Sequence, residues 1–469
     1  MATATVTCHT VTGGETSVRR RQWWAWAVAA VVVVWAVAPL VLHWLTNSDD
    51  QRLVDLDVYR TGGQVLLDGG EVYKYFTPAP QLLPFTYPPV AAMLAVALAE
   101  MSWGTAQWVW TAGIFVTLAV TVGFAFRDVL TRPLGSAQEV AGEQAPGEHD
   151  PDERRAAPGA AGLPEVLRRT QVALRRILTG GTRHAPWLFA FLMMACTYLM
   201  PIRDQVRFGQ VDIMLVALCL ADCVARRPWW PRGFLIGLAT AVKLTPGVFL
   251  VYLLITRQWR TLFMASFVTA LLTLLPFAVI PRDAAGFWFS ALFDPNRLGS
   301  NAGTTNQSIR GMLMRLYMND TLTSVLWVAL VAVVGWYGFR AARDAYRAGD
   351  HVAAVALVGL MAVLLSPVAW IHHLAWVVVV LGALVGDGRD PVRLRVAAGV
   401  WLYYVLPIPW WGVALKAAEI PVLSPVLGKI VQNAFGLGAL ALVWLLGSWL
   451  PKRRAVQPSP GALPAHYPL

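Results

Sequence analysis

Two carboxylates follow the first long apolar segment of the chain, and their position makes them candidates for chemistry. Asp55 and Asp57 stand just beyond the apolar run from Trp23 to Trp44. An ionisable side chain at the mouth of a membrane span is costly and by default indicates a functional site, although a solvated loop position is the alternative. A partly desolvated carboxylate can act as general base toward a sugar hydroxyl. The two acids lie on opposite sides of an extended segment and about 160° apart on a helix, so we expect one of them to do the chemistry.

A single lysine interrupts a later apolar run. Lys243 follows the segment from Gly237 to Val242 and stands three residues before Pro246. An ammonium group binds phosphate well as a point charge, and a lipid-borne phosphate at the membrane surface is the obvious ligand. The alternative is a lysine near a helix end whose stem covers apolar surface while its charge reaches water.

Adjacent histidines form the most unusual string of the chain. His372 and His373 follow Trp370 and a proline break at Ser366-Pro367. Consecutive helical residues lie about 100° apart and rarely reach the same metal ion, and the metalloprotease spacing H-E-x-x-H is absent. Imidazole titrates near neutrality and can donate to a phosphate or a sugar hydroxyl, so we favour ligand binding and predict no cofactor.

Two further polar breaks are candidate substrate contacts. The first contains Arg203, Asp204, Arg207, Gln210 and Asp212, for which a structural ion pair is the alternative. The second is a polar loop that presents amide and guanidinium groups, and its residues are Asn306, Gln307, Ser308 and Arg310. The loop also fits the three-residue glycosylation pattern N-x-S, which is a weak signal.

The elements that must position these residues are membrane helices. Of 469 residues, 57% are hydrophobic and only 14% are charged, whereas a soluble domain carries about a quarter charged residues. The net charge of +11 comes from short basic clusters between apolar segments, which is how the positive-inside rule appears in a sequence. A nucleic-acid partner is therefore not expected, and an all-α, polytopic integral membrane protein is predicted.

The polar segments between the apolar runs alternate between basic and non-basic. This alternation predicts about twelve membrane crossings, with both termini in the cytoplasm. The run Val90 to Ala99 is shorter than the roughly 17 to 25 residues of a span, so we interpret it as an interfacial or re-entrant helix. The predicted divisions are a cytoplasmic N-terminus (1–22), two spans around the acidic extracytoplasmic loop (23–126), a partly disordered cytoplasmic insertion (127–185), the remaining membrane helices (186–450) and a cytoplasmic tail (451–469).

Taken in order, these motifs resemble glycosyltransferase family 87. The resemblance rests on Asp55-x-x-Val58-Tyr59, Tyr87-Pro88-Pro89, Gly209-Gln210, Lys243-x-x-Pro246, Asn306-Gln307-Ser308-x-x-Gly311 and Ser366-Pro367-x-x-Trp370-x-His372-His373. The family consists of GT-C membrane enzymes and includes polyprenyl-phosphate-mannose-dependent mannosyltransferases of phosphatidylinositol mannoside and lipomannan synthesis. One departure is Asp212, where relatives tend to carry Asn.

The resemblance implies a multi-pass plasma-membrane enzyme that acts at the extracytoplasmic face. It places the base on Asp55, and it makes Tyr59, Tyr87, Gln210 and Trp370 candidate substrate contacts. The implied reaction is an inverting transfer of mannose from the lipid phosphate to a mannosylated lipid or glycan. Lys243, Arg310 and the two histidines are the expected phosphate ligands. Another polyprenyl-linked sugar remains an alternative donor, and a transporter or flippase is the rival from another class.

Overall fold

Helices make up almost all of the ordered secondary structure. The computed structural model describes residues 13–46, 53–131, 184–294, 297 and 299–456. Within these ranges the extended structure amounts to two isolated β-bridges, Phe76 with Pro84 and Asn306 with Trp370. The all-α prediction is therefore confirmed. Most of the predicted insertion at 127–185 lies outside the described residues, as do parts of both predicted terminal segments.

The helices follow one another with short breaks. The first third of the chain forms α1 (Gly13–Leu45), α2 (Val54–Leu67), α3 (Pro89–Ala99), α4 (Trp103–Ala125) and α5 (Arg127–Leu130). The middle forms α7 (Ala185–Thr197), α8 (Met200–Phe208), α9 (Asp212–Val224), α10 (Phe234–Val242), α11 (Val248–Ile255), α12 (Trp259–Val279) and α13 (Pro281–Phe289). The last third forms α14 (Ile309–Met314), α15 (Asp320–Arg347), α16 (His351–Leu364), α17 (Val377–Val385), α18 (Pro391–Val405), α19 (Ile408–Ala417), α20 (Leu423–Gln432), α21 (Ala434–Trp444) and α22 (Leu450–Val456). Short 3₁₀ turns η1 (Val72–Lys74), η2 (Thr245–Gly247), η3 (Ala291–Phe293) and η5 (Ile371–Trp376) and a π-helical turn (Leu445–Trp449) join some of them.

Several of these helices are long and apolar enough to cross a membrane. In the described part of the chain there are five, and seven if each of two bent helix pairs is one span. Their large side chains face outward, as at Trp35 and Phe263, which are 79% and 71% exposed. Such surface is stable in lipid and not in water, so the membrane prediction is confirmed. Four shorter apolar helices, α3 among them, add to these, and the count of twelve crossings stays a prediction.

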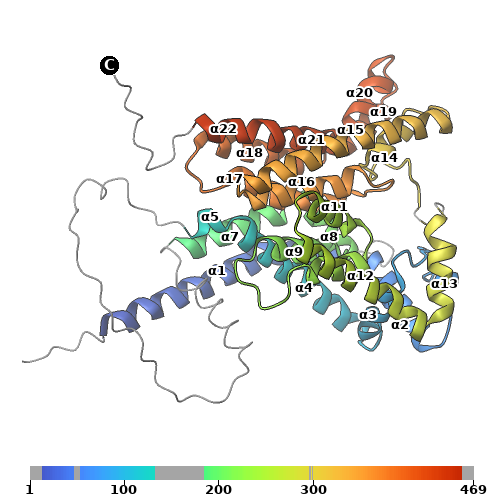
Figure 1. Ribbon diagram of the computed structural model, residues 1–469, viewed down its shortest axis with the longest axis horizontal. Coiled ribbons are helices and arrows are strands. Elements are labelled where there is room, and N and C mark those ends of the chain that lie inside the picture. Colours follow the sequence, from blue (N-terminus) through green and yellow to red (C-terminus); the bar gives the residue numbers. More distant parts are fainter. Residues whose placement is uncertain (1–12, 47–52, 132–183, 295–296, 298, 457–469) are drawn as a thin grey trace, which may run out of the picture.

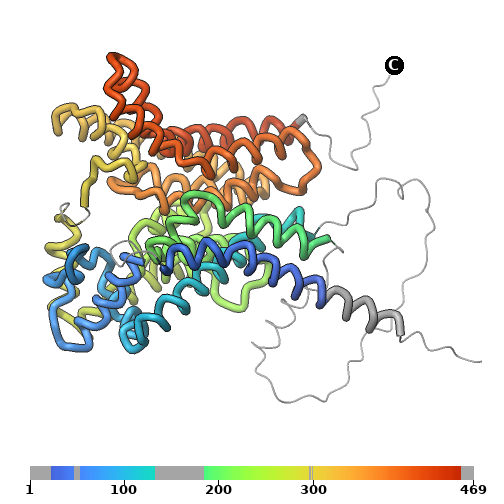
Figure 2. Tube along the Cα trace, turned by 180° about the vertical axis from the view of Figure 1, so that it is seen from behind, coloured from blue at the N-terminus to red at the C-terminus, as the bar shows by residue number. Residues whose placement is uncertain are grey.

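The helices form two layers that run along the long axis of the molecule (Figure 1). The C-terminal helices α15 to α18, α21 and α22 lie in one layer, and α1, α4, α9 and α12 lie in the other, an arrangement that is also visible from behind (Figure 2). Helices α5 and α22 lie at one end of the molecule, whereas α2, α3 and α13 lie at the opposite end. We refer to the latter as the α2 end.

The core lies between the two layers. Helix α16 is buried from Val352 to Leu364, with Val355, Ala356 and Leu357 at 0% exposure, and α17 is buried almost as completely. Both are built from small and β-branched apolar residues, so they pack on all sides rather than along one stripe. This packing fixes η5 and its two histidines, which lie between α16 and α17 in the chain.

Helix α2 packs against α3 at the α2 end because glycine allows close approach. A Cβ atom at Gly63 would lie 2.5 Å from the carbonyl oxygen of Ala95, so no larger residue fits there. The first turn of α2 carries Asp55 and Asp57. Negative charge is favourable at this position because the unpaired N–H groups of a first turn carry partial positive charge.

Candidate active site

Asp55 lies beside a hydrogen-bonded cluster of two tyrosines and a glutamine. The hydroxyl oxygens of Tyr59 and Tyr87 are 2.8 Å apart, and they lie 3.2 and 3.1 Å from Gln210 Oε1. Gln210 also forms a side-chain hydrogen bond with Asp55, which its amide NH₂ must donate because the oxygen serves the tyrosines. Burial raises the pKa of Tyr87 to about 12, so its hydroxyl stays protonated. The structure thus brings four predicted site residues together.

The two acids of α2 have different surroundings. Asp55 interacts with Gln210, Lys243 and Asp212, whereas Asp57 interacts with Arg60 and Thr61. Burial raises the pKa of Asp55 to about 7, against the opposing effects of the Gln210 hydrogen bond and the Lys243 charge. A carboxylate with a pKa near the working pH suits general base catalysis. Of the two, only Asp55 faces the other charged residues of the site.

Lys243 forms a buried ion pair with Asp212. Its Nζ atom lies 2.7 Å from Asp212 Oδ1, and the two side chains are 12% and 9% exposed. Helix α10 ends at Val242, and Lys243 adopts an extended conformation. Its ammonium group also lies 3.4 Å from the Tyr87 hydroxyl and 5.2 Å from the centroid of that ring. The lysine therefore points into the protein, and its charge does not reach water.

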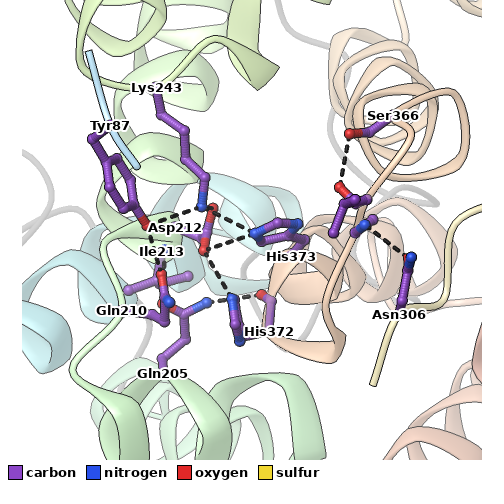
Figure 3. A network of polar contacts seen from close by, with 12 residues as sticks. Tyr87, Gln205, Gln210, Asp212, Ile213, Lys243, Asn306, Ser366, His372 and His373 are labelled. Carbon is purple, nitrogen blue, oxygen red and sulfur yellow. Dashed lines mark hydrogen bonds and ion pairs between the residues drawn. The ribbon is translucent and has the colours of Figure 1, made fainter. Parts of the chain in front are cut away.

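Both histidines converge on the same carboxylate. His373 Nε2 lies 3.0 Å from Lys243 Nζ, and because an ammonium group can only donate, this nitrogen accepts (Figure 3). The Nε2 atoms of His372 and His373 lie 3.9 and 3.8 Å from Asp212 Oδ2. Adjacent histidines were expected to reach one point only rarely. Here the rings lie edge to face, with centroids 4.7 Å apart, on the 3₁₀ turn η5.

These residues have hydrogen-bonding capacity left for a ligand. Asp212 Oδ2 and His372 Nε2 are buried and have no hydrogen-bond partner among the described residues. Buried polar atoms are nearly always paired, so two unpaired atoms 3.9 Å apart indicate a functional group that binds there. They lie beside the ammonium group of Lys243, which suits an anionic or polar ligand.

The same three residues have the composition of a metal site. The ligand atoms of Asp212, His372 and His373 lie within 4.8 Å of one another. However, Lys243 Nζ already lies 2.7 Å from Asp212 Oδ1 and 3.0 Å from His373 Nε2. A divalent cation would have to displace this charge or bind beside it at a large electrostatic cost. The donor set therefore fits an anion next to the lysine better than a metal ion.

The Asn306 loop lies behind the histidines and holds their segment in place. Asn306, Gln307 and Ser308 are 0% exposed. Asn306 Oδ1 accepts from the backbone N–H of Ala369 at 3.0 Å (Figure 3). Ser308 Oγ donates to the carbonyl of Pro367 at 3.1 Å. The backbone of Asn306 pairs with that of Trp370. These side chains use their hydrogen-bonding groups within the protein, so they support the segment that precedes His372, and contact with substrate stays a prediction for them.

Two predicted arginines lie apart from the lysine and the histidines. Arg310 packs over the ring of Trp327 on α15, 5.3 Å from its centroid. Arg203 lies on α8 and lines a separate cavity. Neither has a described contact with Lys243 or His372, and for both a direct role at the reacting atoms stays a prediction.

One site residue was missed by sequence reasoning. Gln205 Nε2 donates to the carbonyl oxygen of His372 at 2.8 Å, which ties α8 to η5. Its position between Arg203 and Gln210 within a short polar helix is the only signal that could have suggested it. Helix α8 ends at Phe208, and the φ of 72° at the following Gly209, together with its contact with Leu56, requires glycine. This turn directs Gln210 and Asp212 toward Lys243.

The fold and the site define a class of protein: a multi-pass helical membrane protein with a buried cluster of an acid, a lysine and two histidines. Comparison with known families identifies it further, because residues 85–367 match glycosyltransferase family 87. The chain belongs to this family of glycosyltransferases.

Two similar proteins are each named polyprenol-phosphate-mannose-dependent α-(1-2)-phosphatidylinositol mannoside mannosyltransferase. The one from Mycolicibacterium smegmatis is 34% identical over 403 residues, covering 82% of both chains. The one from Mycobacterium tuberculosis is 32% identical over 389 residues, covering 80% of this chain and 82% of its own length. A third relative, from another Mycobacterium tuberculosis strain, is named as a phosphatidylinositol pentamannoside mannosyltransferase with the same donor and linkage, and it is 27% identical over 81% of this chain and 78% of its own. No solved structure matches the chain.

Proposed function

We propose that this glycosyltransferase moves mannose from polyprenol-phosphate-mannose to a phosphatidylinositol mannoside in an α-(1-2) linkage, at the extracytoplasmic face of the plasma membrane. The donor, acceptor class and linkage follow from the names of the relatives that cover about four fifths of the chain. The sidedness follows from the basic clusters, which the positive-inside rule assigns to the opposite face. Helix α2, with Asp55, then lies outside the cytoplasm.

The reaction proceeds by attack of an acceptor hydroxyl on the anomeric carbon of the donor mannose. A bond forms between that oxygen and C1, the bond between C1 and the phosphate oxygen breaks, and the configuration at C1 inverts. Asp55 takes the proton of the attacking hydroxyl. Its raised pKa, about 7, makes it a competent proton acceptor near neutral pH. Gln210 orients the carboxylate through their hydrogen bond.

The leaving group is a polyprenyl phosphate, which departs with the electron pair of the broken bond. A phosphate monoester has a second pKa of about 6, so the departing oxygen needs charge stabilisation and not a proton. Lys243 supplies a preorganised positive charge in a site with little water. His372, whose Nε2 is unpaired, donates to the phosphate or holds the acceptor.

The observation that carries this proposal is the approach of Asp55 and Lys243 within one buried cluster, connected through Gln210 and Tyr87. A base and a phosphate-binding cation within one cluster are what a transfer from a lipid phosphate requires. Although α2 and α10 lie far apart in the sequence, the fold brings their functional side chains together.

The deciding experiment uses purified protein, synthetic polyprenyl-phosphate-mannose and a phosphatidylinositol mannoside acceptor, with the product linkage determined by NMR. We expect an α-(1-2)-linked mannose whose anomeric configuration is the opposite of the donor's. Transfer from a different lipid-linked sugar alone would overturn the choice of donor. Retention of configuration would overturn the single-displacement mechanism.

A further inference from the structure

A polar cavity lies on the side of α8 opposite Gln205. Its volume is about 460 Å³, and it is lined by His43 and Trp44 of α1, by Met200, Arg203, Asp204 and Arg207 of α8, and by Pro407. The four lining residues of α8 have the spacing i, i+3, i+4 and i+7, which places them on one helical face. Gln205, which contacts the His372 segment, lies on the other face.

Among the described residues, the charges that line this cavity are not balanced. Asp204 is buried and interacts electrostatically with both arginines. In the described part of the chain, however, neither Arg203 nor Arg207 forms an ion pair with a carboxylate within 4.0 Å. Arg203 Nε is buried and has no hydrogen-bond partner. Two guanidinium groups against one carboxylate leave a positive charge that an anion can neutralise.

The position of the cavity relative to the membrane indicates which anion. Its α1 wall is the end of the candidate span Trp23–Leu45, where lipid headgroups lie. Trp44 is typical of this depth, because tryptophans concentrate at membrane interfaces. Helix α8 is bent by 74° from α7 and so departs from the direction of that helix. The arginines therefore occupy the level at which phospholipids carry their phosphate groups.

The cavity is also connected to the catalytic cluster through the backbone. The N–H of Leu53, immediately before α2, donates to the carbonyl of Arg207 at 2.8 Å. The Arg207 guanidinium lies 5.0 Å from the centroid of the Phe208 ring, which in turn packs edge to face on His372. A lipid held in the cavity thus has its headgroup beside the start of the helix that carries Asp55.

We propose that Arg203 and Arg207 bind the phosphodiester group of the acceptor lipid and thereby present its sugar headgroup to Asp55. Guanidinium groups bind phosphate through paired N–H donors, which fits a ligand of fixed orientation better than a lysine would. The inference rests on the proposed function, because it assigns a role within that reaction. It differs from the role of Lys243, which binds the phosphate of the donor.

The experiment compares two acceptors in steady-state kinetics. One is a phosphatidylinositol mannoside, and the other is an alkyl mannoside, which has no phosphate. In the variant Arg203→Gln/Arg207→Gln we expect KM for the phospholipid acceptor to rise about tenfold or more, because the charge-assisted hydrogen bonds to the phosphodiester are lost. KM for the donor should stay unchanged. With the alkyl mannoside as acceptor, kcat and KM should stay unchanged as well. Arg282→Gln, an exposed arginine of α13, is the matched control.

A binding measurement that needs no turnover accompanies the kinetics. Glycerophosphoinositol, the deacylated phosphodiester headgroup, should raise the unfolding temperature of the wild type but not of the double variant. Inositol, which has no phosphate, should leave the unfolding temperature of both proteins unchanged. Inorganic phosphate at the same concentration tests for a free-phosphate site, and equal stabilisation by it would contradict a headgroup site. Arg203→Lys, which retains the charge but lacks the paired donors, should show an intermediate effect if the double variant fails to fold.

Equal loss of activity with both acceptors, or a rise in KM for the donor, would overturn the assignment of the cavity to the acceptor. Failure of the wild type to transfer mannose to either acceptor would instead overturn the proposed function. In that case the stabilisation by glycerophosphoinositol still tests whether the cavity binds a phosphodiester.

Discussion

Lys243 and Asp212 form an ion pair, 2.7 Å between Nζ and Oδ1, which is nearly closed to water and adjoins two unpaired buried atoms. An ion pair in this environment has two consequences. It holds the ammonium group at one point, and it makes each charge dependent on the other for its stability.

Removing the proposed base should abolish most of the activity. We expect Asp55→Asn to lower kcat by about a hundredfold to ten-thousandfold, with KM for the donor little changed, because general base catalysis contributes this much. Asp57→Asn is the matched control, since Asp57 faces Arg60 and Thr61. Kinetics on both purified variants decide the matter, and an inactive Asp57→Asn beside an active Asp55→Asn would reverse the assignment.

The transfer rate should depend on pH through Asp55. Its pKa of about 7 means that the carboxylate is protonated, and so unable to accept a proton, below neutral pH. The rate should therefore rise between about pH 6 and 8 and then level off. The residual activity of Asp55→Asn should lack this rise. A flat profile for the wild type over the same range would contradict the role of Asp55 as base.

The same raised pKa has a consequence for stability. Between pH 4 and 7 the folded protein keeps a proton on Asp55 that the unfolded chain has lost, so the contribution of this residue to stability falls as pH rises through that window. Asp55→Asn should thus raise the unfolding temperature in detergent at pH 8 and change it little at pH 4. A lower unfolding temperature at pH 8 would indicate that the carboxylate is better stabilised than its burial implies.

The ion pair can be tested with a double-variant design. Lys243→Met should destabilise the protein by about 3 to 5 kcal/mol, because it leaves the buried Asp212 carboxylate unpaired. Adding Asp212→Asn should restore most of that stability, as measured by unfolding in denaturant. We expect neither protein to recover donor binding, with KM for the donor raised at least tenfold. Recovery of a normal KM in the double variant would show that the lysine has only a structural role.

The Asn306 loop should matter through the segment that it holds. Asn306→Ala removes an acceptor used by the backbone of Ala369 and of Ser308, at 3.0 and 3.2 Å. A buried N–H left without a partner costs about 1 to 3 kcal/mol, so the unfolding temperature should fall. Ser366→Ala, in the same segment, removes only a donor to the carbonyl oxygen of Val368 and leaves no backbone N–H unpaired, so it should lower the unfolding temperature less. Equal destabilisation by the two substitutions would argue against this hydrogen bond as the cause.

Hydropathy predicted the helical membrane fold because burial in lipid demands continuous apolar segments with internal backbone hydrogen bonds. The residues Asp55, Lys243 and His372 were also predicted, since each is a polar group in apolar surroundings. That these side chains meet in one cluster was not predicted. The predicted membrane topology put Lys243 and the histidines on one side of the membrane, but the distance of 3.0 Å between Lys243 and His373 depends on how η5 and the end of α10 pack.

The burial of Asn306 and the two-sided character of α8 were similarly outside the reach of the sequence. A polar loop of the composition Asn-Gln-Ser is as suited to hydrogen-bonding a ligand as to hydrogen-bonding a neighbouring backbone. Only the positions of Ala369 and Pro367 distinguish these uses. Helix α8 has only nine residues, so its sequence pattern alone does not show which face packs on the histidine segment and which lines the cavity. The neighbouring helices determine this.

Helix α8 presents Gln205 to the histidine segment and the two arginines to the opposite side. With the roles proposed above, one face of this helix supports the catalytic residues and the other face recognises the lipid. Substitutions at 203 and 207 can then alter which lipids are glycosylated while the catalytic geometry is preserved. The same two positions offer a starting point for redirecting the enzyme to lipids with other headgroups.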